Sequence, residues 1–340
     1  MNLATAIRAR KLEDLPGKRD EAWRWTDLRG LIRTAPEPST ALDTAGLPAG
    51  PFDPLAEETL VIANGVGGGR ISVAAGETRV VALRIVSRGA GAHAGGVTVS
   101  VAAGGRLTLL ESYDGEGSYL AHAALAIDCG GAIERIVLAA DDAEGVSVSQ
   151  AEVVLQPGAR FAQTLLTGGG RRQRLETAVR HPGGHAELRL DGVYLLDGKR
   201  HADLTTVVTH TGFDGATDQL TKGVVRDQAR GVFQGKIVVK AGADRTDARM
   251  GHHALILSDR AEVDAKPELE IYADDVSCAH GNTVGALDQE ALFYARQRGI
   301  PEADARAMLT EAFVGQVVDR IEHEGARELA RAWVAGRLAP

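Results

Sequence analysis

Alternating hydrophobic and polar residues run through most of the chain, in short stretches that glycines interrupt. Val97–Val101 precedes one such glycine and Leu107–Leu109 follows it. Alternation with a period of two, rich in Val, Ile, Leu and Thr, is typical of a half-buried β-strand. Similar pairs of stretches surround four glycines that lie 26 or 27 residues apart, namely Gly105, Gly131, Gly158 and Gly184. The pattern therefore predicts a repeat of two strands and one glycine turn.

A repeat of this length predicts a β-solenoid, because one coil buries too little apolar surface to be stable until it stacks on the next. The usual hand of parallel crossovers makes it a right-handed parallel β-helix, which we place at residues 59–285. The alternative is an antiparallel sandwich, whose tight hairpins favour Asp-Gly pairs. Such pairs occur at Asp191-Gly192, Asp197-Gly198 and Asp214-Gly215. The constant period favours the solenoid.

The first part of the chain has a different pattern. Residues 1–58 are expected to form an N-terminal helical region and linker, with one helix from Leu3 to Leu15. Trp23 and Trp25 are expected to pack within a small helical cap. Five prolines between positions 36 and 54 then indicate an irregular linker.

Residues 286–340 are predicted to form a C-terminal helical domain. Asp288 can cap a helix that ends at Gly299, and Pro301 can start a second helix. One apolar stripe of the second helix is expected to pack on the solenoid end as a cap, while a partial second stripe is free to dock another subunit. The first stripe contains Ala305, Met308, Leu309, Ala312, Phe313, Val317 and Ile321.

Composition limits the possible functions. The chain has 38 Lys and Arg against 46 Asp and Glu, a formal net charge of −8, which argues against a nucleic-acid surface. No stretch approaches the ~20 consecutive apolar residues that span a bilayer, and the first residues lack the pattern of a secretion signal. The two cysteines do not form a disulfide framework, so we expect a reducing cytoplasm.

The strongest candidate chemistry lies in Asp274–Gly281. Cys278 and His280 are two positions apart, so they project from the same face of an extended strand. A thiolate and an imidazole together suit iron or zinc. Two ligands do not complete a metal site, and a buried cysteine beside a hydrogen-bonded histidine explains the spacing more simply. The arginine cluster Arg171–Arg174 is interpreted as a solvated corner.

Residues 231–300 contain a series of longer motifs in a fixed order. They include Gly231–Ile237, Ala265–Ile271, Asp274–Gly281 and Leu292–Ile300. This ordered set resembles the SufB/SufD family of iron–sulfur cluster assembly proteins. Because sister SufB chains usually carry additional N-terminal cysteines, the two cysteines here favour the SufD branch.

The resemblance implies a non-enzymatic scaffold subunit that pairs with a SufB-like subunit through the β-helix ends. It also implies that a SufC-like ATPase docks on the C-terminal helices. The family's functional histidine corresponds to His280, accompanied by Cys278, with Ala279 in place of the usual serine. No cofactor is expected to be held stably, and an iron–sulfur cluster is expected only transiently, together with SufB. The residues expected to contact the ATPase are Asp288, Leu292, Phe293, Tyr294, Arg298, Phe313 and Val317.

Two other hypotheses stay open at this point. One is a stand-alone metal-binding protein or metalloenzyme that uses His280, Cys278, His252 and Asp275. The other is an inactive storage homodimer, in which two copies pair through edge strands that SufB leaves free.

Overall fold

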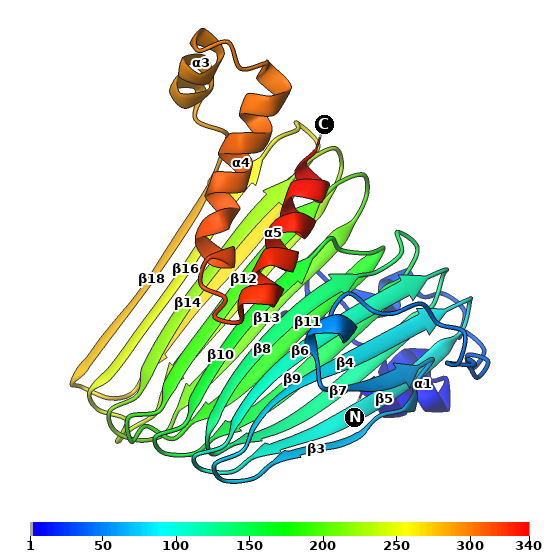
Figure 1. Cartoon of the computed structure of the whole chain (residues 1–340), viewed down its shortest axis with the longest axis vertical. Helices are drawn as coiled ribbons and strands as arrows, with labels where there is room; N and C mark the ends of the chain where they lie inside the picture. The colour runs from blue at the N-terminus through cyan, green and yellow to red at the C-terminus, as the bar shows by residue number, and fades with distance from the viewer. Residues whose placement is uncertain (1–2, 340) are drawn as a thin grey trace.

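A computed structural model describes residues 3–339, and its centre is a solenoid of stacked coils (Figure 1). Successive coils give their strands to two sheets. The ten-stranded sheet contains, from end to end, β18 (Val276–Gly285), β16 (Thr246–Ile256), β14 (Ala216–Val225), β12 (Glu187–Leu196), β10 (Arg160–Thr167), β8 (Ala132–Ala140), β6 (Arg106–Glu116), β4 (Thr78–Arg88), β1 (Glu58–Ala63) and β2 (Val66–Gly67). Neighbouring strands in both sheets are parallel except for the antiparallel pair β1 and β2.

The second sheet has eight strands and faces the first across the core. It contains β17 (Glu262–Ile271), β15 (Arg230–Val239), β13 (His201–His210), β11 (Arg172–His181), β9 (Val146–Leu155), β7 (Leu120–Cys129), β5 (Ala92–Val101) and β3 (Gly69–Val73). The predicted β-solenoid is therefore confirmed, and the sandwich is wrong. Asp197-Gly198 and Asp214-Gly215 lie between strands of different sheets, so they form solenoid corners and not hairpins.

The interior of the solenoid is filled mainly by aliphatic side chains, as the small aromatic content of the sequence requires. Polar exceptions are paired. Arg135 donates to both carboxylate oxygens of Glu111, at 2.7 and 2.9 Å, and neither side chain is more than 2% exposed. Tyr113 donates to the same carboxylate at 2.5 Å. This network shows that a buried charge is tolerated where it is matched within the core.

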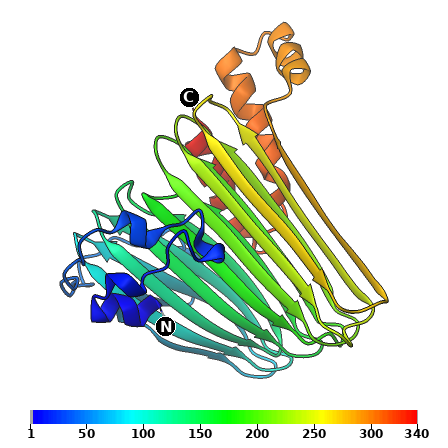
Figure 2. The same cartoon turned by 180° about the vertical axis from the view of Figure 1, so that it is seen from behind.

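The N-terminal region contains short helices only, namely α1 (Leu3–Ala9), η1 (Leu12–Asp14), η2 (Glu21–Trp23), α2 (Leu28–Leu31) and η3 (Asp53–Leu55). Its part up to Ile32 lies on the outer face of the eight-stranded sheet (Figure 2). In contrast, η3 lies against β4 on the outer face of the ten-stranded sheet. The single helix expected from Leu3 to Leu15 is wrong, because Arg10 has a φ of 57° and ends the helical hydrogen bonding.

The segment around Trp23 covers a buried ion pair on this face. Arg174 is 1% exposed, donates to Asp203 at 2.8 Å and has its guanidinium 4.3 Å from the Trp23 ring centroid. Thr26 also donates to Asp203. The interpretation of Arg171–Arg174 as a solvated corner is therefore wrong for Arg174, because residues far away in sequence cover it.

The C-terminal helices are α3 (Gln289–Gln297), α4 (Glu302–Val318) and α5 (Glu324–Leu338). Asp288 accepts hydrogen bonds from the backbone N–H groups of Glu290 and Ala291, and Gly299 ends the first helix with a φ of 84°. Both predicted helix signals are therefore confirmed. None of the helices in residues 3–339 is long and apolar enough to cross a membrane.

The predicted packing of these helices is wrong. The lower half of α4 and most of α5 pack on the outer face of the ten-stranded sheet, so they cover its flank and leave the solenoid end free (Figure 1). Val317 and Ile321 of the first predicted stripe are buried against the sheet, while Met308 of that stripe is 54% exposed. Val314 and Val318, the partial second stripe expected to dock another subunit, are buried there too, so that expectation is wrong. The sheet that covers both stripes is not visible in the helix sequence.

Candidate functional site

The C-terminal end of the solenoid is formed by β17 and β18, each ten residues long. These are the last strands of their sheets, and no strand within residues 3–339 pairs with the outer edge of either. In Figure 2 they form the bare yellow and orange side of the solenoid. The end is therefore open both at its strand edges and over its core.

Cys278 and His280 lie on β18, and their side chains follow the row that faces the core. They align with Ala248 and Met250 of β16, which are 0% and 2% exposed. Because no coil of the described part of the chain covers β18, Cys278 is only half-buried and His280 is exposed. Partial burial raises the pKa of the Cys278 thiol, so ligation by this sulfur requires loss of a proton.

The backbone of the same residues faces the open edge. Asp247 of β16 donates its N–H group to Gly215, directly before β14, and Leu257, directly after β16, donates to Val225 of β14. The odd-numbered residues of β16 therefore bond to β14, and the even-numbered ones bond to β18. In a parallel ladder such a residue bonds to the two neighbours of its partner. Residues 279 and 281 therefore bond to β16, while Cys278 and His280 present their backbone N–H and C=O groups to any added strand.

Asn282 is a third polar residue of this row that the sequence interpretation missed. Its side-chain oxygen lies 2.7 Å from Nδ1 of His252, whose Nε2 lies 2.9 Å from the Tyr194 hydroxyl. His252 is 0% exposed and stacks on Phe233, and burial lowers its pKa to about 4. Continuing the two-residue alternation from His280 would have found Asn282.

The four-residue metal site is not formed. Both ring nitrogens of His252 are engaged, and Asp275 lies in the exposed turn before β18. Within the described chain, residues 3 to 339, no three His, Cys, Asp or Glu side chains come together in a group that could hold a metal ion. The structure brings together only Cys278 and His280, from one strand.

The open edge of β17 differs from that of β18. Glu262 of β17 donates its N–H group to Ala229, directly before β15, and Tyr272, directly after β17, donates to Val239 of β15. The backbone groups of the odd-numbered residues between them therefore face outward. One of these is Pro267, which has no N–H to donate. Proline at this position interrupts the edge in the middle of β17, whereas β18 contains no proline.

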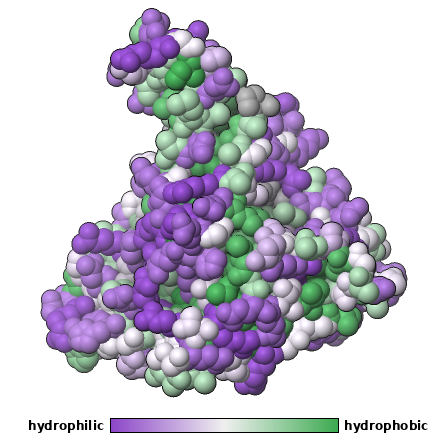
Figure 3. All heavy atoms as spheres, viewed as in Figure 1, coloured by the Kyte–Doolittle hydropathy of each residue, from purple (hydrophilic) through white to green (hydrophobic). Residues whose placement is uncertain are grey.

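The helical residues expected to contact an ATPase differ in accessibility. Phe293 and Tyr294 are 62% and 60% exposed on α3, which projects with the upper half of α4 beyond the strands (Figure 1). Figure 3 shows hydrophobic side chains among hydrophilic ones on this projecting part. Leu292 is buried, and Val317 is fully buried against the sheet.

The remaining three residues have local partners. Arg298 donates to the Tyr294 hydroxyl at 2.5 Å, and its guanidinium lies 4.8 Å from the ring centroid. Asp288 caps α3. Phe313 is half-buried and lies over the ammonium of Lys222. The accessible part of the predicted surface is therefore the α3 tip, with Phe313 further along α4.

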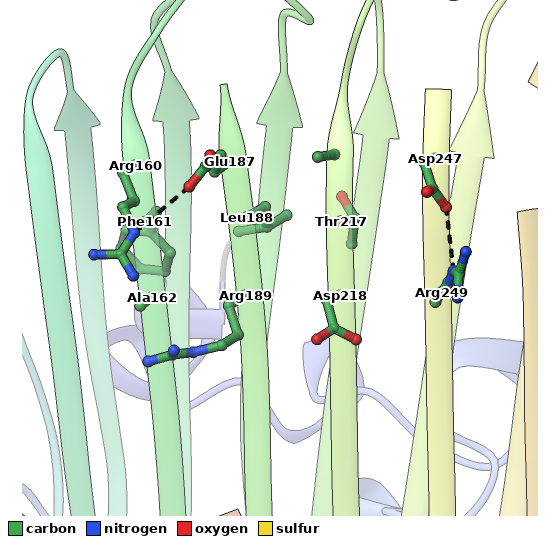
Figure 4. A pocket seen from close by; sticks show the side chains of 11 residues that line it. Arg160, Phe161, Ala162, Glu187, Leu188, Arg189, Thr217, Asp218, Asp247 and Arg249 are labelled. Atoms are coloured by element: carbon green, nitrogen blue, oxygen red, sulfur yellow. Dashed lines mark hydrogen bonds and ion pairs between the residues drawn. The ribbon is translucent and has the colours of Figure 1, made fainter. Parts of the chain in front are cut away.

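A groove of about 400 Å³ crosses the outer face of β10, β12, β14 and β16 (Figure 4). Its charged residues pair with each other or with the turn after α4. Arg160 contacts Glu187 and Glu322, and Asp247 contacts Arg249 at 3.3 Å. The groove contains no Cys or His, so its charges are matched and we assign no chemistry to it.

A family model described as the SufBD core domain of the SUF system for FeS cluster assembly matches residues 84–313. The chain belongs to the SufBD family. The match contains most of the solenoid, the open end with Cys278 and His280, and the part of α4 that includes Phe313. The resemblance seen in residues 231–300 is thereby confirmed.

Individual SufBD relatives agree. The chain is 37% identical over 178 residues to the iron-sulfur cluster assembly protein SufD of Escherichia coli. This matched segment is 52% of this chain and 42% of that protein. It is 33% identical over 131 residues to SufD of Bacillus subtilis, or 38% and 30% of the two chains. A SufBD family protein of Mycobacterium bovis is 27% identical over 361 residues, 96% of this chain and 90% of that one. The matches to the two SufD proteins thus span less than half of those proteins' lengths.

Proposed function

We propose that this SufBD protein is a non-catalytic scaffold subunit on which iron–sulfur clusters are assembled. In this proposal a SufB-like subunit pairs with the open end of the solenoid, and a SufC-like ATPase docks on the C-terminal helices. The observation that carries the proposal is the position of Cys278 and His280, which share the core-facing row of a terminal strand with an unpaired edge.

Strand pairing is proposed to occur along β18. The backbone groups of Cys278 and His280 face that edge, and no proline interrupts it, whereas Pro267 interrupts β17. A partner strand added there would cover the core-facing row as well. The thiol and the imidazole would then lie at the joint, where the partner supplies the remaining ligands of the cluster.

The cluster is the cargo of the complex in this proposal. The Cys278 sulfur would bind iron after losing its proton, and the neutral imidazole of His280 would bind through a ring nitrogen. The apolar residues Val263 and Leu269 of β17 pack against the same core and would limit access of water. With Cys278 half-buried and His280 exposed in the free subunit, the site would be suited to holding a nascent cluster only while the joint is closed.

Communication with the ATPase is proposed to run through α4. This helix begins beside the projecting α3 and ends on β12 and β14, two and one strands from β16. Movement of an ATPase bound to Phe293 and Tyr294 would therefore be transmitted to the sheet that carries His280. ATP hydrolysis by the partner would open the joint to incoming iron and sulfide.

The test is His280→Ala in a complex reconstituted with the SufB-like and SufC-like partners. We expect iron and acid-labile sulfide on the purified complex to fall at least tenfold, because an imidazole ligand is lost, while the three subunits still co-elute. His185→Asn is the matched control, since His185 is exposed at a solenoid corner with a φ of 60° that asparagine tolerates. Unchanged iron and sulfide in His280→Ala would refute the proposed role.

A further inference from the structure

Lys222 is a buried cation with no carboxylate partner among residues 3–339. It lies on β14 beneath α4 and is 5% exposed. Its ammonium donates to the side-chain oxygen of Gln316 at 2.7 Å and lies 4.1 Å from the centroid of the Phe313 ring. Within residues 3–339 these are its side-chain partners, and neither is an anion.

The buried arginines, in contrast, each have a carboxylate partner. Arg84, Arg135 and Arg174 are each at most 6% exposed, and each has a carboxylate oxygen within 3.1 Å. Transfer of an ammonium out of water without a matching anion is unfavourable. Lys222 is thus the exception to a rule that this chain otherwise follows.

Neighbouring elements supply no compensating charge. Lys222 aligns with Val193 of β12 on one side and with His253 of β16 on the other. Nδ1 of His253 lies 2.7 Å from the Thr283 hydroxyl of β18. Burial, and then the charge of Lys222, lower the pKa of His253, and burial lowers the pKa of Lys222 itself. The surroundings therefore disfavour positive charge.

We infer that Lys222 is one half of an ion pair whose carboxylate is supplied by the ATPase docked on α4. This inference rests on the docking proposed above. Both side-chain contacts of the ammonium come from α4, where Gln316 is exposed and Phe313 is half-buried. A protein docked on this helix would bring its carboxylate to the ammonium by displacing the exposed Gln316 side chain. An aspartate or glutamate side chain fits the ammonium, and the Phe313 ring would exclude water from the pair.

The experiment compares Lys222→Met with the unmodified full chain in the SufB-like complex. We expect the variant chain to be at least as stable to urea, because an unpaired buried charge has been removed. We expect its affinity for the ATPase, measured by calorimetry, to fall at least tenfold. Lys199→Met is the matched control, because Lys199 is exposed on a corner loop and should change neither quantity. If Lys222→Met does not fold, Lys222→Gln provides the same comparison with a polar side chain.

Two outcomes would overturn the inference. A variant that loses stability but binds the ATPase as tightly as the unmodified chain would show that Lys222 serves only to hold α4. Equal affinity with equal stability would likewise exclude a partner carboxylate. Failure of the unmodified chain to bind the ATPase would overturn the docking proposal itself, and is thus distinct from a failure of the variant alone.

A spectroscopic readout separates the ion pair from simple covering of α4. Titration of the Lys222 side chain by carbon-detected NMR should give a pKa that rises by about one unit or more when the ATPase binds, because a nearby carboxylate favours the charged form. Burial by an uncharged surface would lower the pKa further, which contradicts the inference.

Discussion

The two ends of the solenoid present opposite kinds of strand edge. At the N-terminal end, β2 has two residues and pairs antiparallel with β1, and β3 has five residues. Four glycines with positive φ, Gly65, Gly67, Gly68 and Gly69, distort this end further. At the C-terminal end, β17 and β18 each run for ten residues.

This difference favours the C-terminal end as the one that would receive another chain. Short and irregular edge strands resist pairing, whereas long regular edges favour it. Matched buried networks such as Glu111–Arg135 lie in the coils behind the N-terminal end, while the polar row Cys278, His280 and Asn282 lies at the other. We therefore expect interior substitutions to change stability and open-end substitutions to change binding.

We expect acid to cause the largest loss of folding stability, through protonation of buried histidines. Burial lowers the pKa of His93, His201 and His252 to about 4. In the unfolded chain these histidines take up protons near pH 6.5, whereas in the folded chain they stay neutral until about pH 4. Their neutral burial therefore leaves the free energy of unfolding unchanged above pH 6.5 and lowers it as pH falls from 6.5 toward 4. At pH 5 each costs about 2 kcal/mol, roughly 6 kcal/mol together.

Urea unfolding at pH 7 and pH 5 measures this loss. A stability that stays constant between pH 7 and pH 5 would contradict the buried, neutral state of the three interior histidines.

Breaking the interior ion pair should have the next largest effect. Glu111→Ala leaves the guanidinium of Arg135 with Gln163 as its remaining hydrogen-bond partner, which we expect to cost about 3–5 kcal/mol. His280→Ala at the open end should change the free energy of unfolding by no more than about 0.5 kcal/mol.

Urea unfolding of both variants at pH 7 gives the comparison. Glu152→Ala is the control for loss of a carboxylate, because Glu152 is exposed on the outer face of β9. A cost below about 1 kcal/mol for Glu111→Ala would be within the range of an exposed site and would argue against a buried charge pair.

The smallest expected effect is on binding of the SufB-like subunit, and it is tested by substituting one hydrophobic residue at each end of the solenoid. Val284 on β18 is 44% exposed, and Val66 on β2 is 63% exposed. Val284→Lys should weaken binding of the SufB-like subunit about tenfold, or about 1.4 kcal/mol, because lysine on an edge strand opposes pairing. Val66→Lys should leave binding unchanged. Equal weakening by both variants in sedimentation analysis would show that the two ends do not differ as partners.

Local signals in the sequence predicted much of the fold. The turn at Gly105, the cap at Asp288 and the helix end at Gly299 depend on residues a few positions away, and all three appear in the structure. The same is true of Cys278 and His280, whose shared face follows from strand alternation alone.

Contacts between distant segments could not be predicted in this way. Arg174 is buried by Asp203 and by Ala22, 29 and 152 positions away, so its local sequence of arginines suggested a solvated corner. Gln316, the residue that binds Lys222, lies 94 positions further along the chain. The face of α4 that packs on the sheet was likewise set by strands of the solenoid, including β12 and β14, which one helical stripe does not reveal.

The restriction of regular edges to one end limits how large an assembly can grow. A rod with two receptive ends adds copies without limit and forms a filament. A rod with one receptive end adds no further subunit once that end is paired. The distorted glycine-rich end at β2 and β3 has no regular strand edge on which a third subunit could pair. The stoichiometry of such a complex is then set by the shape of the subunit and not by its concentration.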